Sequence, residues 1–142
     1  MIYHIINRGN RRDDIFHMPK DYDYFMGLLA DYSDRFEAWV YHWVIMPNHY
    51  HILLEIKDPE KLSKMLAGLA RSYVYHYQRN YNIGGHIWQG RFKSQPIEKE
   101  KYLLACGRYI GWEKGTAPFF SKSLTARKKG AVPFSFLFLF LK

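Results

Sequence analysis

Apolar and polar positions follow two different periods along the chain. Apolar side chains at three- and four-residue steps, the spacing of an amphipathic helix, occupy residues 19–36, 59–82 and 99–112. Alternation bounded by turn residues, which is typical of strands, occupies residues 3–7, 37–45, 49–56 and the end of the segment 86–97. The pattern therefore predicts the order strand, helix, strand, strand, helix, strand, helix.

This order indicates an α+β fold of the ferredoxin-like kind, with an antiparallel sheet and two helices packed on one face. The helix over residues 99–112 is an added C-terminal element. Two helices on one face leave the other face for His49, His51 and the added helix. The chain has 142 residues and no long linker, so it fits one domain that can bury a core without disulfides.

Two histidines stand at the start of the strand 49–56, directly after a Pro-Asn turn. Because successive side chains of a strand alternate in direction, His49 and His51 point to one face and Tyr50 to the other. Two imidazoles on one face can converge on a divalent ion and leave coordination positions for a substrate oxygen. A solvated histidine pair is the alternative interpretation.

The composition is basic and aromatic. Lys and Arg number 21 against 13 Asp and Glu, the net charge is +8, and aromatic residues reach 18%. Cations attract phosphates and rings stack on unpaired bases, so this composition favours nucleic acid as the partner. A basic protein whose tyrosines fill its core would have the same composition.

The lone Cys106 excludes an intramolecular disulfide and a thiolate zinc cluster, which fits a cytoplasmic, nucleoid-associated protein. The apolar segment 134–141 is far shorter than the roughly 20 residues that span a bilayer, so we expect no membrane partner.

Two segments concentrate cations and polar groups in loops beside the predicted strands. One follows the first strand, and the other interleaves cations with aromatic residues ahead of the last strand. Such segments suit phosphate contacts and stacked bases, although a solvated, arginine-rich turn is the alternative. The predicted nucleic-acid face consists of Arg8, Arg11, Arg12, Gln89, Arg91 and Lys93.

The third predicted helix carries a stripe of chemically useful side chains. At 100° per residue, Tyr109 and Glu113 are neighbours one turn apart, provided that the helix continues past Gly111. A tyrosine with a packing role is the alternative interpretation of Tyr109.

Four segments give the chain a likeness to a known family. In order along the chain, they are Asn7-Arg8-Gly9-Asn10-Arg11, Met46-Pro47-Asn48-His49-Tyr50-His51, Trp88-Gln89-Gly90-Arg91-Phe92-Lys93-Ser94, and Tyr102-Leu103-Leu104 through Arg108-Tyr109-Ile110. Over roughly residues 1–110 the sequence resembles the single-tyrosine HUH transposase superfamily, most closely its REP-associated tyrosine transposase branch.

The resemblance implies an enzyme that cleaves and rejoins single-stranded, hairpin-forming DNA through a 5′-phosphotyrosine intermediate. It assigns Tyr109 as the nucleophile and His49, His51 and Glu113 as ligands of Mg²⁺ or Mn²⁺. Glu113 stands where the family pattern has its third, polar ligand. We expect a catalytic domain over residues 1–115, acting as a monomer or homodimer, and a divergent tail over residues 116–142, as a frameshifted or decayed C-terminus would produce.

Two other functions compete with this one. A binding domain for single-stranded DNA or RNA, or a decayed transposase, would use the same basic surface without chemistry. A metal-dependent hydrolase would use water in place of Tyr109 and leave a free 5′ end. A protein–DNA adduct separates the tyrosine enzyme from both.

Overall fold

The computed structural model describes residues 1–98 and 121–123. The elements are, in chain order, β1 (Ile2–Arg8), η1 (Asn10–Arg12), α1 (Pro19–Arg35), β2 (Trp39–Met46), β3 (His49–Glu55), α2 (Pro59–Tyr81), β4 (Lys93–Ile97) and β5 (Ser121–Ser123). Each helix and strand predicted within residues 1–98 is confirmed, with small shifts of its ends. The helix predicted over residues 99–112 lies outside the described residues.

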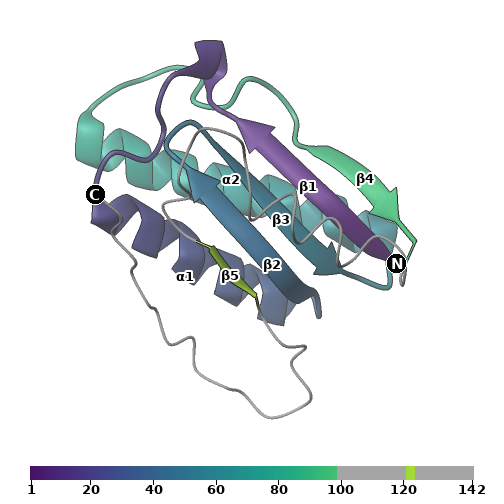
Figure 1. Ribbon diagram of the computed structural model, residues 1–142. Coiled ribbons are helices and arrows are strands. Elements are labelled where there is room, and N and C mark those ends of the chain that lie inside the picture. The colour runs from purple at the N-terminus through teal and green to yellow at the C-terminus, as the bar shows by residue number, and fades with distance from the viewer. Residues whose placement is uncertain (99–120, 124–142) are drawn as a thin grey trace.

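The five strands form one sheet in the order β4-β1-β3-β2-β5, and every neighbouring pair is antiparallel. Figure 1 shows α1 and α2 side by side behind this sheet, on one of its faces. The ferredoxin-like α+β arrangement predicted from the sequence is therefore confirmed. β5 was not predicted; it lies in the segment 116–142 and extends the sheet beyond β2.

Both helices begin at a proline, and α2 also has favourable residues at both of its caps. Each has proline at its first position, where the missing N–H costs nothing. At the start of α2, the Asp58 carboxylate accepts a hydrogen bond from the Glu60 amide at 2.9 Å. At its end, Asn82 adopts the left-handed conformation (φ 48°, ψ 40°) that terminates many helices. Within the described chain, neither helix combines the length and apolar character needed to cross a membrane.

The main core lies between the helices and the sheet, and aromatic residues dominate it. The rings of Phe25 and Tyr50 are 4.9 Å apart, and Trp88 meets Tyr50 edge-on at 5.6 Å. Buried tyrosines contribute much of this core, namely Tyr3, Tyr22, Tyr50, Tyr73 and Tyr77. Because these tyrosines pack in the core, a large part of the aromatic content is not evidence for stacking on nucleic-acid bases.

The two helices touch closely where Gly68 of α2 faces Tyr32 of α1. A β-carbon at Gly68 would lie 2.6 Å from Cε1 of the Tyr32 ring, closer than atoms can approach without a shift. One turn further along α2, Ser72 shares a hydrogen bond with the Tyr32 hydroxyl, Oγ to Oη 2.8 Å. Glycine at this position therefore sets the distance between the helices.

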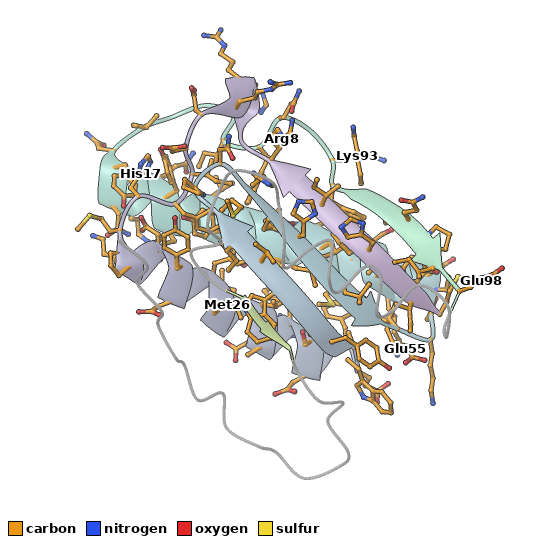
Figure 2. All side chains as sticks on the ribbon, in the orientation of Figure 1. Arg8, His17, Met26, Glu55, Lys93 and Glu98 are labelled. Atoms are coloured by element: carbon orange, nitrogen blue, oxygen red, sulfur yellow. The ribbon has the colours of Figure 1, made fainter. Side chains whose placement is uncertain are left out.

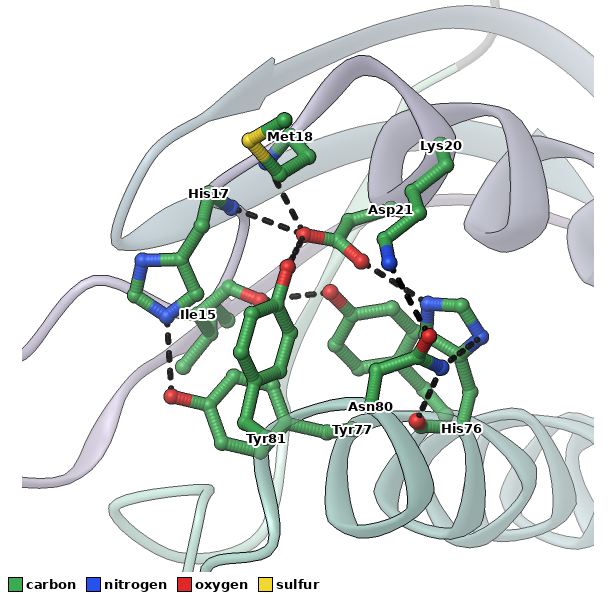
Figure 3. Close-up of polar contacts among 10 residues, drawn as sticks. Ile15, His17, Met18, Lys20, Asp21, His76, Tyr77, Asn80 and Tyr81 are labelled. Atoms are coloured by element: carbon green, nitrogen blue, oxygen red, sulfur yellow. Dashed lines mark hydrogen bonds and ion pairs between the residues drawn. The ribbon is translucent and has the colours of Figure 1, made fainter.

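A buried carboxylate fixes the segment that leads into α1. Asp21 is 0% exposed, and its Oδ2 accepts hydrogen bonds from the backbone amides of His17 (3.0 Å) and Met18 (2.9 Å) and from the Tyr81 hydroxyl. Its Oδ1 lies 2.8 Å from Nε2 of His76 on α2 (Figure 3). Burial alone would raise the pKa of Asp21, but these hydrogen bonds outweigh burial and hold the pKa below its ordinary value of 3.8.

Candidate functional site

The histidines of β3 lie on the sheet face that the helices do not cover. Tyr50 and Ile52 point into the core beneath the helices, so His49 and His51 point the opposite way, as predicted. Their ring centroids are 5.2 Å apart and the ring planes are inclined by 80°. His51 is 4% exposed, whereas His49 is half-buried. The pair therefore forms one compact group at the start of a central strand.

Each of the two imidazoles makes a hydrogen bond through its Nδ1 atom. His49 Nδ1 lies 2.6 Å from Oδ1 of Asn48, and His51 Nδ1 lies 3.0 Å from Nε2 of His4 on β1. An amide oxygen can only accept, so the proton of a neutral His49 is on Nδ1 and its lone pair is on Nε2. That is the tautomer in which His49 can ligate a metal through Nε2.

The turn that precedes the histidines is held by the loop that follows β1. The Pro47 carbonyl accepts a hydrogen bond from the Ile15 amide at 2.7 Å, and the Asn48 carbonyl accepts one from the Gly9 amide at 2.8 Å. A β-carbon at Gly9 would lie only 2.2 Å from the carbonyl oxygen of Asp13, so this loop can close only with glycine there. The loop thereby immobilises the histidine hairpin.

The two basic segments predicted to bind nucleic acid come together in space. The Gln89 amide donates to the Arg8 carbonyl at 2.9 Å, and the Asn10 amide donates to the Ile87 carbonyl at 2.8 Å. The two segments border a surface pocket of about 360 Å³, lined by Ile6, Asn7, Arg8, Gln89, Gly90, Arg91 and Lys93. Figure 2 shows Arg8 and Lys93 at the same end of the sheet, away from Glu55 and Glu98.

The other two predicted contacts, Arg11 and Arg12, are exposed in η1 and do not line this pocket. Both have left-handed backbone conformations, with φ of 55° and 60°. Such conformations are unfavourable for residues other than glycine, and they turn the chain sharply beyond the end of β1.

Strand register connects the pocket to the histidines. Arg8 is paired with His49 across β1 and β3, and Ile6 is paired with both His51 and Lys93. Paired residues of antiparallel strands project from the same face, and adjacent strands are about 4.8 Å apart. Arg8 is thus one strand from the histidines and Lys93 two strands, or about 10 Å, away on the same face.

Comparison with known proteins gives this site its context. Residues 1–112 match the family described as IS200-like transposases. The chain belongs to this family. The membership agrees with the resemblance that the four sequence segments carry. No curated protein matches the chain.

Two solved structures share the fold of this chain. One is a REP-associated tyrosine transposase bound to a REP hairpin, with a TM-score of 0.57 and 17% identity over 77% of this chain. The other is a candidate transposase of Deinococcus radiodurans R1, with a TM-score of 0.57 and 16% identity over 78% of this chain. The match spans 63% of the REP-associated protein, less than two thirds of its length, and 88% of the Deinococcus protein.

The described part of this chain contains two of the three predicted metal ligands. His49 and His51 present imidazole nitrogens on one face, a donor set that fits a divalent ion. Among residues 1–98 and 121–123, no group of three His, Cys, Asp or Glu side chains is placed to hold a metal. Glu113, the third predicted ligand, and the predicted nucleophile Tyr109 lie outside the described residues.

The sequence pattern alone does not single out His4 and Asn48 as the partners of the two histidines. The alternation along residues 3–7 predicts a strand, but it does not say which residue of another strand faces His4. That information is in the register, which pairs Ile6 with His51 and sets His4 diagonally beside it. For Asn48 there was a signal, since it immediately precedes His49 in a tight turn.

Proposed function

We propose that this chain cleaves and rejoins single-stranded, hairpin-forming DNA through a covalent bond between Tyr109 and the 5′-phosphate of one fragment. One observation carries the proposal: the strand register sets the histidine pair and two cations of the basic pocket, Arg8 and Lys93, on the same sheet face, away from the helices. Membership of a transposase family supports the same reaction class. A DNA strand along β1 and β4 would then pass beside the histidines.

The histidines serve the scissile phosphate in this proposal. His49 and His51, with Glu113, would hold Mg²⁺ or Mn²⁺, of which Mn²⁺ suits imidazole better. When bound, such an ion withdraws charge from the phosphate and orients it for in-line attack. The chain's own contribution is the fixed geometry of the two imidazoles, because the hairpin turn that presents them is anchored by the loop after β1.

The nucleophile needs this help because tyrosine is a weak acid. With an ordinary pKa of about 10, roughly one tyrosine in a thousand is a phenolate at pH 7, which corresponds to about 4 kcal/mol against attack. In the reaction the Tyr109 oxygen bonds to phosphorus, and the bond from phosphorus to the 3′ oxygen breaks. The phenol loses its proton, and the departing 3′ oxygen gains a proton to become a hydroxyl. The phosphodiester energy stays in the tyrosine ester, so rejoining to a 3′-hydroxyl requires no ATP.

The basic pocket would bind the DNA backbone next to the reacting phosphate. Arg8, Arg91 and Lys93 supply cations, and Gln89 supplies both a donor and an acceptor for a phosphate or a base edge. The REP-associated relative was solved with a hairpin, which supports hairpin DNA as the substrate class for this chain. The catalytic domain in this proposal spans residues 1–115, and residues 116–142 are a divergent tail.

The test is adduct formation on labelled single-stranded hairpin DNA with Mn²⁺, resolved on a denaturing gel beside a binding assay. Wild type should give a protein–DNA adduct. Tyr109→Phe removes only the hydroxyl oxygen, so it should bind the hairpin as wild type does and form no adduct. The matched control is Tyr75→Phe, an exposed tyrosine of α2 on the helical side, which should form the adduct normally.

Two outcomes would contradict the proposal. Cleavage by Tyr109→Phe at the wild-type rate, with a free 5′ end, would establish a hydrolase in which water attacks. Hairpin binding by wild type without cleavage, at every Mg²⁺ and Mn²⁺ concentration, would establish a binding domain without chemistry.

A further inference from the structure

A third histidine, His4 of β1, lies against the histidine pair. Its Nε2 is 3.0 Å from Nδ1 of His51. The two ring planes are nearly parallel, inclined by 15°, and the ring centroids are 5.2 Å apart. His51 is 4% exposed, so this contact is made in a largely water-free environment.

The contact has a definite consequence for the tautomer of His51. When both rings are neutral, one nitrogen must donate and the other accept. If His51 donates through Nδ1, its lone pair is on Nε2; if His4 donates, the His51 proton is on Nε2 and that nitrogen cannot bind a metal.

We propose that His4 is a positioning residue that accepts a hydrogen bond from Nδ1–H of His51 and thereby holds His51 ready to ligate through Nε2. This inference rests on the proposed function, in which His51 is a metal ligand. His4 itself is not a ligand in this arrangement, because its Nε2 is directed at His51.

The neighbouring histidine is oriented in the same way from a different part of the chain. Asn48 accepts from Nδ1–H of His49 at 2.6 Å and belongs to the same hairpin. His4 belongs to β1, so the orientation of His51 depends on the pairing of β1 with β3. A hydrogen-bond partner on the ring nitrogen that does not bind the metal fixes the tautomer and ring orientation of a metal-binding histidine. Loss of that partner typically weakens metal affinity by about 10- to 100-fold.

The first measurement needs no metal and no DNA. Long-range ¹H–¹⁵N NMR of the full chain assigns the His51 tautomer in wild type, His4→Gln and His4→Phe. Glutamine keeps an acceptor near the Nε2 position, whereas phenylalanine keeps an aromatic ring of similar size but has no acceptor. We expect the Nδ1–H tautomer of His51 in wild type and His4→Gln, and a shift towards Nε2–H in His4→Phe. An unchanged tautomer in His4→Phe would overturn the proposal.

The second measurement is Mn²⁺ affinity by titration calorimetry on the same three proteins, with folding checked by circular dichroism. His4→Phe should bind Mn²⁺ about 10- to 100-fold more weakly than wild type, and His4→Gln should recover most of the affinity. His86→Phe, at an exposed loop histidine, is the matched control and should bind as wild type does.

The two proposals fail in distinguishable ways. Equal Mn²⁺ affinity of wild type and His4→Phe would overturn the role of His4 and leave the proposed function intact. Absence of Mn²⁺ binding by wild type would overturn the metal role of His51 and, with it, this inference.

Discussion

Removing the cations of the basic pocket should weaken DNA binding by a predictable, salt-dependent amount. The perturbation is the triple substitution Arg8→Gln, Arg91→Gln and Lys93→Gln. These residues border one pocket, and Arg8 is paired with His49 across the two strands. Glutamine retains hydrogen-bonding capacity and most of the side-chain length, so the change is chiefly one of charge.

The magnitude follows from counterion release. Each single-strand phosphate neutralised by a cation contributes about 0.7 to the slope of log affinity against log salt. Three cations that each neutralise one phosphate therefore contribute about 2 units of slope. Over a fourfold rise in salt, from about 50 to 200 mM, these cations account for a loss in wild-type affinity of about 20-fold. The triple variant should lose that share of the salt dependence.

The assay is fluorescence anisotropy of a labelled hairpin with a single-stranded extension, at several salt concentrations. The control variant carries Lys64→Gln, Arg71→Gln and Arg79→Gln, which remove the same charge from exposed positions on α2. The control should keep the wild-type slope within a few tenths. If both triple variants lower the slope equally, the effect is one of net charge and the pocket is not the DNA site; if neither does, the electrostatic account of this surface is wrong.

Three further predictions concern stability and metal dependence. Asp21→Asn should destabilise the fold by about 3 kcal/mol at pH 7 in urea denaturation. Because the folded-state pKa of Asp21 lies below 3.8, the stability that its carboxylate contributes is present above pH 3.8 and is lost as the pH falls through the folded pKa. The curves of unfolding free energy against pH for wild type and Asp21→Asn should therefore converge in acid. Curves that stay parallel down to pH 2 would refute this. Gly27→Ala, with open space at its β-carbon, should stabilise α1 by about 0.5–1 kcal/mol. Gly68→Ala, whose β-carbon would lie only 2.6 Å from the Tyr32 ring, should destabilise the fold by about 1 kcal/mol. The opposite order of stabilities would disprove the close helix contact. Excess chelator, and His49→Ala even with added Mn²⁺, should abolish the adduct but not hairpin binding, and an adduct in either case would exclude the assigned metal role.

The sequence by itself determined the type and order of the elements in residues 1–98. Helical spacing from Pro19 and from Pro59 and alternation around His49 and His51 are local properties, since residues a few positions apart share a face of a helix or strand. The same alternation predicted that His49 and His51 point away from Tyr50. The Pro-Asn turn between two alternating segments is a local signal as well, and β2 and β3 pair on either side of it.

Tertiary structure alone decided which distant residues meet. His4 faces His51 because β1 pairs with β3 in one particular register, and a shift by one residue would turn either side chain to the opposite face. The basic segments became one pocket only when the Gln89 amide bonded to the Arg8 carbonyl. Tertiary packing also decided that Tyr50 and Tyr73 are core residues. The physical reason is that local periodicity specifies only the direction in which a side chain points. Which strands pair, and in which register, depends on cross-strand contacts and apolar burial summed over the whole sheet and core.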